Sequence, residues 1–112
     1  MNTVIHLTSD DPDDWGHAVR SANMLASNEW LAHDDLTLLA HRTGARIVAP
    51  DSTHADEVRD LLDRGVTVTV GESCLDSLNV RHGTIDGVET VSSGVTELVR
   101  LQSAGYNYVK IP

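Results

Sequence analysis

Apolar residues recur along this chain in two patterns, short runs typical of strands and longer stripes typical of amphipathic helices. Short β-branched and aliphatic runs predict five strands, over residues 3–8, 36–41, 66–70, 88–92 and 106–111. Between them, apolar positions spaced by three and four predict helices over residues 13–27, 53–64, 72–78 and 95–104. Strands that alternate with helices predict an α/β fold, a three-layer α/β/α domain with a five-stranded, mainly parallel sheet.

Local signals sharpen some of these boundaries. Pro12 suits the first position of a helix, and Gly65 stands where a glycine cap ends one. Residues 66–70 alternate strictly between valine and threonine, which predicts a strand with one face less buried than its neighbours. Residues 42–50 predict a loop that could contain one turn of helix, because Gly44 indicates a turn and Pro50 ends any regular element.

The length of 112 residues predicts one domain, residues 1–112. No apolar run is long enough for a signal peptide or a membrane span, so we expect a cytoplasmic protein without a membrane partner. The single cysteine, Cys74, has no internal disulfide partner and fits a reducing compartment.

The charge is strongly acidic. Seventeen Asp and Glu residues, twelve of them Asp, face seven Arg and one Lys, for a net charge of −9. This composition is typical of halophilic surfaces, where excess negative charge keeps proteins dispersed in salt. It argues against nucleic acid as a partner, because affinity for phosphate backbones comes from clustered Lys and Arg.

Candidate chemistry gathers at one predicted edge. Ligands of parallel sheets bind beyond the carboxyl ends of the strands, which are residues 6–9, 41–44, 71–74 and 92–94 here. Cys74 falls on this edge, in the first turn of a predicted helix that would favour its thiolate, although acidic residues flank it. The alternative is a buried cysteine that acts as a small apolar side chain.

The last third of the chain resembles a known family. Its strand at residues 66–70 runs into Gly-Glu-Ser-Cys, followed by a helix that contains Gly-Val-Thr-Glu-Leu-Val-Arg-Leu-Gln and a closing strand, Gly-Tyr-Asn-Tyr-Val-Lys. This order resembles the DsrE/DsrF-like family of small sulfur-relay proteins, and the acidic composition suggests a haloarchaeal member. The resemblance implies the same α/β fold and a cysteine that carries sulfane sulfur as a persulfide.

The resemblance also implies site residues. In sulfur-carrying members the cysteine opens the loop after the third strand; matching Leu75 to a leucine of that loop puts Gly71 at the cysteine's place and Cys74 three residues later. His6 resembles a histidine at the end of the family's first strand, and Arg42 replaces the first glycine of its His-Gly-x-Gly turn. We therefore predict Cys74 as the catalytic residue, and as ligand-binding residues His6, Asn23, His41, Arg42, Gly71 and Ser73.

Two functions remain open. The first is a sulfur carrier or transferase, although the chain has no complete catalytic signature. The second is a non-catalytic oligomeric module that binds a small ligand or a partner and has lost the carrier cysteine. The six histidines match no local metal motif, so neither a metal nor a cofactor is predicted.

We expect a homo-oligomer, with sulfur-relay proteins as possible further partners. Aromatic residues such as Trp30, Tyr106 and Tyr108, together with Leu31, remain to be buried, and aromatic residues are enriched at interfaces. Residues 78–85 and 106–112 carry few acidic residues, so we place the contact there.

Overall fold

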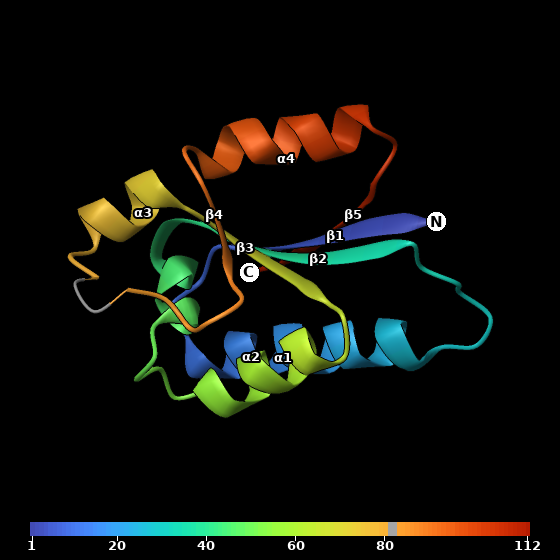
Figure 1. The fold of residues 1–112 in the computed structure, drawn as a ribbon, viewed down its shortest axis with the longest axis horizontal. Helices are drawn as coiled ribbons and strands as arrows, with labels where there is room; N and C mark the ends of the chain where they lie inside the picture. Colours follow the sequence, from blue (N-terminus) through green and yellow to red (C-terminus); the bar gives the residue numbers. More distant parts are fainter. Residues whose placement is uncertain (81–82) are drawn as a thin grey trace.

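The computed structural model describes residues 1–80 and 83–112, and there it shows a five-stranded sheet between two layers of helices (Figure 1). The strands are β1 (Asn2–Leu7), β2 (Asp35–Ala40), β3 (Thr67–Gly71), β4 (Glu89–Val91) and β5 (Asn107–Ile111). The helices are α1 (Pro12–Ser27), α2 (Ala55–Asp63), α3 (Glu72–Ser77) and α4 (Gly94–Ser103), with a 3-10 helix η1 (Arg42–Val48).

The sheet has the strand order β4-β3-β2-β1-β5, and every neighbouring pair is parallel. Helices α1 and α2 cover one face, while α4 lies over the other with α3 beside it (Figure 1). The predicted α/β/α fold is therefore confirmed, with a sheet that is entirely rather than mainly parallel.

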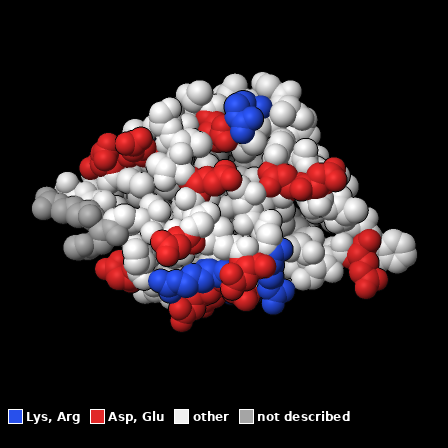
Figure 2. All heavy atoms as spheres, in the orientation of Figure 1, with Lys and Arg blue, Asp and Glu red and all other residues white. Residues whose placement is uncertain are grey.

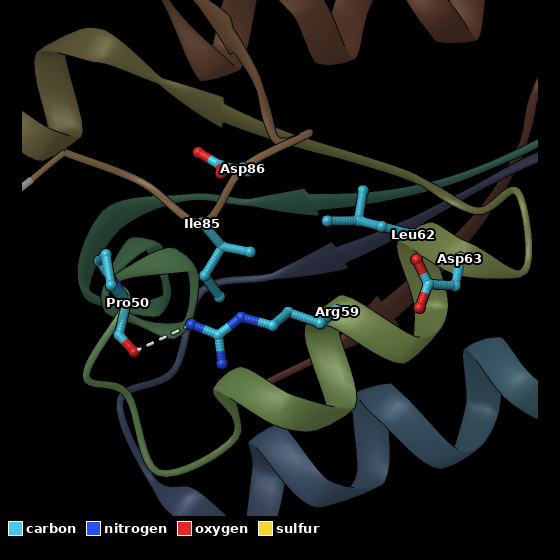
Figure 3. A pocket seen from close by; sticks show the side chains of 6 residues that line it. All are labelled: Pro50, Arg59, Leu62, Asp63, Ile85 and Asp86. Carbon is cyan, nitrogen blue, oxygen red and sulfur yellow. Dashed lines mark hydrogen bonds between the residues drawn. The ribbon is translucent and has the colours of Figure 1, made fainter.

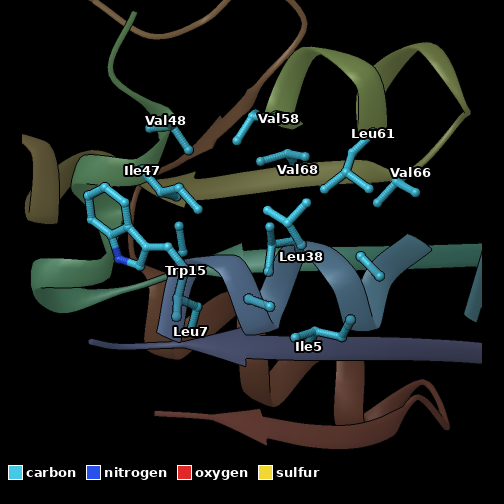
Figure 4. Packing of buried hydrophobic residues seen from close by; sticks show 14 of the residues in the cluster. Ile5, Leu7, Trp15, Leu38, Ile47, Val48, Val58, Leu61, Val66 and Val68 are labelled. Carbon is cyan, nitrogen blue, oxygen red and sulfur yellow. The ribbon is translucent and has the colours of Figure 1, made fainter. Parts of the chain in front are cut away.

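The main core lies between the sheet and the layer of α1 and α2. Figure 4 shows Trp15 from α1 and Leu61 from α2 packed against strand residues such as Leu38, all of them buried. A smaller cluster of Val4, Leu39 and Leu101 lies under α4. The inner strands are therefore apolar on the face toward α1 and α2, whereas their other face also buries polar residues such as Thr37 and Thr69.

Helix boundaries follow the local chemistry that the sequence indicated. Pro12 opens α1, and the side chain of the capping residue Asp11 accepts a hydrogen bond from the Asp13 amide. Gly65 follows α2 with a φ of +87°, in the left-handed region that favours glycine. The other element ends lie within two residues of their predicted positions.

Two expectations need correction. Residues 42–48, predicted as a loop that could contain one turn of helix, form a 3-10 helix of 7 residues, in which Ala45, Ile47 and Val48 are fully buried against the main core. Strand β3 has no distinctly exposed face, since Thr69 is only 1% exposed beneath the α4 layer. The alternation of valine and threonine in residues 66–70 therefore does not correspond to a solvent-exposed face of the strand.

The α4 layer leaves part of its face of the sheet uncovered. Helix α4 packs over β2 and β3. On β5, at the other side of the sheet, Tyr108 keeps 42% of its surface exposed. Polar side chains of β1 and β5 consequently meet near solvent on this face.

The surface is rich in carboxylates. Figure 2 shows acidic side chains spread over one face, with the few basic ones beside them. Within the described part of the chain, Arg59, Arg64 and Arg100 each pair with an acidic residue on their own helix or at its end. Among the same residues, no helix combines the length and the apolar character that a membrane crossing needs.

We predict that salt stabilises the fold. Unscreened carboxylates repel one another over a Debye length of about 30 Å at 0.01 M salt but only about 3 Å at 1 M. The melting temperature should therefore rise steadily as sodium chloride is added toward molar concentration, measured by circular dichroism. A flat or falling curve would show that the negative charge has no bearing on stability, and the halophilic interpretation would lose its support.

Candidate functional site

The carboxyl ends of the central strands bring most of the predicted site residues together. His6 lies near the end of β1, His41 directly follows β2, and Gly71 ends β3. Ser73 and Cys74 follow in α3, which begins without any intervening loop. Because neighbouring parallel strands end at the same edge, residues far apart in sequence form one cluster.

Two histidines and a tyrosine form a hydrogen-bonded row in this cluster. His6 Nδ1 lies 2.7 Å from the Tyr108 hydroxyl, and His6 Nε2 lies 3.1 Å from His41 Nδ1. The His6 ring is 7% exposed, so the row runs from the partly exposed Tyr108 through a buried imidazole to His41. The sequence pointed to both histidines, but Tyr108 was expected only in a contact surface.

The surroundings of both imidazoles favour the neutral form. Burial lowers the pKa of His6 from 6.5 to about 4, and neighbouring His41 and Lys110 lower it further, because a protonated His6 would be repelled by a positive charge on either of them. Burial, followed by the charges of Arg42 and Lys110, also lowers the pKa of His41. The Lys110 ammonium is held in place by a 2.8 Å hydrogen bond to the Thr8 hydroxyl.

Two glycines allow the elements of the site to approach closely. A Cβ added to Gly94, the first residue of α4, would lie 2.8 Å from Cδ2 of His41. A Cβ added to Gly71 would lie 2.7 Å from the backbone nitrogen of Gly94. The His41 ring, the start of α4 and the end of β3 are therefore packed without room for a side chain between them.

Cys74 is half-buried, and its sulfur contacts the backbone of the β2 edge. Its Sγ accepts a hydrogen bond from the Arg42 amide at 3.3 Å. The thiol lines an open depression of about 350 Å³, whose other lining residues are Arg42, Thr43, Ser73, Ser77 and Leu78.

Asn23 does not join this cluster. It lies in the last third of α1, which begins at the carboxyl edge and returns to the opposite edge of the sheet. There the segment after α1 meets the start of β1, where the Asp34 amide donates to the Met1 carbonyl. The Asn23 Oδ1 atom is buried without a hydrogen-bond partner among the described residues, and ligand binding by Asn23 stays a prediction.

A second depression, of about 410 Å³, lies away from this edge. Figure 3 shows Arg59 extending across it, with the guanidinium directed at the Pro50 carbonyl, to which it donates at 3.4 Å. The same guanidinium donates to Asp56 at 3.1 Å. Among the described residues, neither a thiol nor a histidine lines this depression.

No metal centre is evident in residues 1–80 and 83–112, where no group of three or more His, Cys, Asp or Glu side chains is arranged to hold an ion. Two other histidines have partners elsewhere, His33 with the Thr3 hydroxyl and His54 with the Trp15 ring, and His82 is outside the described residues.

A comparison with known protein families identifies the family of this chain. The sequence model of the DsrE/DsrF-like family matches residues 3–111. The chain belongs to the DsrE/DsrF-like family. Among curated proteins, none matches the sequence.

Solved structures support the fold of this DsrE/DsrF-like chain. A protein of unknown function, MTH1491 from Methanobacterium thermoautotrophicum, is 25% identical, with a TM-score of 0.87 and 97% of each chain covered. The ychN protein from E. coli is 17% identical, with a TM-score of 0.78, covering 98% of this chain and 99% of its own. A conserved protein of unknown function, BT1422 from Bacteroides thetaiotaomicron, is 17% identical at a TM-score of 0.77, with 98% and 95% covered.

The backbone explains how this chain departs from the pattern that we matched to the DsrE/DsrF-like family. Arg42 has a φ of +54°, in the left-handed region where glycine is favoured, and it stands where the family's turn has glycine. Gly71, at the place of the family cysteine, has no space for a side chain against Gly94. The thiol of this chain lies instead one helical turn further on, at Cys74.

The homo-oligomer stays a prediction, as does a haloarchaeal origin. Of the residues that suggested an interface, Trp30 is 93% exposed and Tyr108 42% exposed, while Tyr106 and Leu31 are partly buried. Residues 81 and 82 of the proposed contact segment 78–85 lie outside the described residues.

Proposed function

We propose that this DsrE/DsrF-like protein accepts sulfane sulfur on Cys74 as a persulfide and passes it to an acceptor thiol, in the reducing cytoplasm. The observation that carries the proposal is the 3.3 Å hydrogen bond from the Arg42 amide to Cys74 Sγ at an open depression. That donor stabilises negative sulfur, both in the attacking thiolate and in the persulfide that forms.

The reaction needs no oxidant. The Cys74 thiol loses its proton, and the thiolate attacks the outer sulfur of a donor persulfide, R–S–SH. A new S–S bond forms to Cys74, the S–S bond of the donor breaks, and the departing R–S⁻ takes up a proton. The same steps in reverse pass the sulfur on: the thiolate of an acceptor attacks the outer sulfur of the Cys74 persulfide, and the Cys74 thiolate leaves.

One cation beside Cys74, the Arg42 guanidinium, can bind an anionic group of the donor. Within the described residues, the Arg42 guanidinium takes part in no ion pair, in contrast to Arg59, Arg64 and Arg100. Arg42 lines the depression beside the thiol and partly offsets the carboxylates of the adjacent helix α3. A free guanidinium binds anionic groups well because it presents several N–H donors in one plane.

One observation supports the alternative, a non-catalytic binding module. The place of the family cysteine is closed here, because any side chain at Gly71 would meet the Gly94 backbone nitrogen at 2.7 Å. On this alternative, Cys74 is a partly buried apolar side chain, and the depression beside Arg42 binds a ligand without forming a covalent bond.

Transfer of a sulfur atom to Cys74 distinguishes the sulfur carrier from the binding module. Native protein is incubated with a small-molecule persulfide, freed of donor, and analysed by intact mass spectrometry and peptide mapping. We expect a gain of one sulfur atom on the peptide that contains Cys74, its loss on treatment with a reductant, and its absence in Cys74→Ser. An unmodified native protein, or an equal gain in Cys74→Ser, would leave the binding module as the better account.

A further inference from the structure

We propose that Tyr108, His6 and His41 form a proton relay that carries protons between solvent and the edge of the sheet where Cys74 lies. Its role in catalysis rests on the sulfur chemistry proposed above, whereas the relay itself is a property of three side chains. These come from β5, β1 and the residue after β2, and the two contacts that join them are 2.7 Å and 3.1 Å long.

The two contacts couple the protonation states of the rings. Each hydrogen bond contains one hydrogen, and each neutral imidazole carries one N–H. If Tyr108 donates to His6 Nδ1, then His6 donates from Nε2 to His41 Nδ1, and His41 carries its hydrogen on Nε2. If the direction is reversed, both rings carry their hydrogen on Nδ1 and the Tyr108 hydroxyl donates to solvent. The two histidines therefore always share the same tautomer.

Exchange between these two states moves one proton. Starting with both rings protonated on Nδ1, His41 Nε2 accepts a proton at the sheet edge. His41 passes its Nδ1 hydrogen to His6 Nε2, His6 passes its own to the Tyr108 oxygen, and Tyr108 releases its original hydrogen to water. The row ends with both rings protonated on Nε2, and the reverse sequence returns a proton to the edge.

The surroundings disfavour a resting charge on either ring. His6 is buried, and the cations Lys110 and Arg42 lie near the pair, so the pKa values of both rings are lowered. A proton that arrives at one end is therefore passed on rather than held as an imidazolium. At the other end, Tyr108 is 42% exposed, which gives its hydroxyl access to water.

The sheet-edge end of the relay lies beside the thiol in the chain. His41 immediately precedes Arg42, and the peptide N–H between them is the donor to Cys74 Sγ. The His41 ring packs closely on Gly94, and Gly94 on Gly71 at the end of β3, since a Cβ built on Gly94 would lie 2.8 Å from the ring and one built on Gly71 2.7 Å from the Gly94 nitrogen. The relay therefore ends at the sheet edge where the Cys74 thiol must lose a proton and a leaving thiolate must gain one.

Measuring the tautomers of His6 and His41 tests the relay, and this experiment needs no sulfur donor. Long-range ¹H–¹⁵N correlation spectra of the native protein at neutral pH report the tautomer of each imidazole, with His6→Gln and His41→Gln used for assignment. We expect identical tautomer populations in the two rings. One ring protonated on Nδ1 and the other on Nε2 would overturn the proposal, because the contact between them would then lack a hydrogen or contain two.

The pH dependence of loading tests the catalytic role. In Tyr108→Phe, the rate of Cys74 persulfide formation should fall roughly tenfold at neutral pH, a modest part of what positioned proton transfer supplies. The deficit should disappear at alkaline pH, where the thiol ionises without help, whereas a purely structural defect would persist at every pH. Tyr106→Phe, which removes a hydroxyl that bonds to Asp35 on the same face, is the matched control and should load at the wild-type rate.

The two proposals fail separately. Normal loading of Tyr108→Phe at neutral pH would overturn the catalytic role of the relay and leave the carrier function intact. Loading that survives in Cys74→Ser would overturn the carrier function, while the shared tautomers of His6 and His41 would still be observed.

Discussion

Replacing Gly71 with alanine is expected to lower the free energy of unfolding by about 3 kcal/mol, the upper end of the usual cost of overpacking. The added Cβ would lie 2.7 Å from the Gly94 nitrogen, which is a backbone atom and cannot rotate away. Gly94 has little freedom to retreat, since a Cβ built on it would lie only 2.8 Å from the ring of His41. Strand β3 and helix α4 would have to separate, and the cluster that contains the candidate site would loosen.

Urea unfolding followed by circular dichroism measures this effect. Gly16→Ala is the matched control: it lies inside α1, and its Cβ would first meet the flexible end of Arg20, at 3.1 Å. Alanine within a helix reduces the entropy of the unfolded chain, so this variant should be at least as stable as the wild type. A Gly71→Ala protein within about 0.5 kcal/mol of the wild type would show that α4 can move away, and the closed position at residue 71 would no longer argue against a cysteine there.

The second large effect is expected from Asp35→Ala, with a loss of about 2–3 kcal/mol. The Asp35 carboxylate accepts hydrogen bonds from Tyr106 at 2.6 Å and from Thr37 and Thr67 at 2.7 Å each. These donors come from β2, β3 and the residue before β5, so one carboxylate ties three parts of the sheet together. Without it, the hydroxyls of the buried Thr37 and the partly buried Tyr106 lose their acceptor.

This effect should depend on pH. Burial opposes the charge of Asp35, but the hydroxyl donors outweigh it and lower the pKa of Asp35 below 3.8; its contribution is complete above that pH and is lost as the pH falls through the lowered value. Burial and the bond to Asp35 raise the pKa of Tyr106 from 10 to about 12, so its contribution is complete below pH 10 and is lost toward pH 12. The difference between wild type and Asp35→Ala should be largest between these limits.

Asp34→Ala serves as the control in these unfolding experiments. Its side chain is 90% exposed and only pairs with the terminal amine, so its removal should change the stability by less than about 0.5 kcal/mol. Equal losses of stability in Asp35→Ala and Asp34→Ala would show that the effect comes from the change in net charge. The account of Asp35 as a link between strands would then be wrong.

The elements that were predicted well depend on neighbours in sequence. Pro12 and Asp11 begin α1 through bonds within one turn, and the positive φ of Gly65 ends α2. The residue types alone indicate such local preferences. The extent of the 3-10 helix at residues 42–48 was not predicted, because the apolar positions there reflect burial against the core rather than a helical repeat.

The contacts that build the candidate site depend on residues far apart. His6 and Tyr108 are separated by 102 residues in sequence, and only the parallel pairing of β1 with β5 brings them together. A topological argument was nevertheless possible, since Tyr106, Tyr108 and Lys110 alternate along one predicted strand and share a face. The steric closure at Gly71 depends on how α4 packs, which no local pattern indicates.

Discharge of loaded protein tests the carrier function most directly. Wild-type protein is loaded with a small-molecule persulfide, freed of donor and mixed with an acceptor thiol, and both partners are followed by mass spectrometry over time. We predict that Cys74 loses one sulfur atom at the rate at which the acceptor gains it, and that Cys74→Ser transfers nothing. Sulfur that never loads onto Cys74, or that stays there in the presence of the acceptor, would contradict the account.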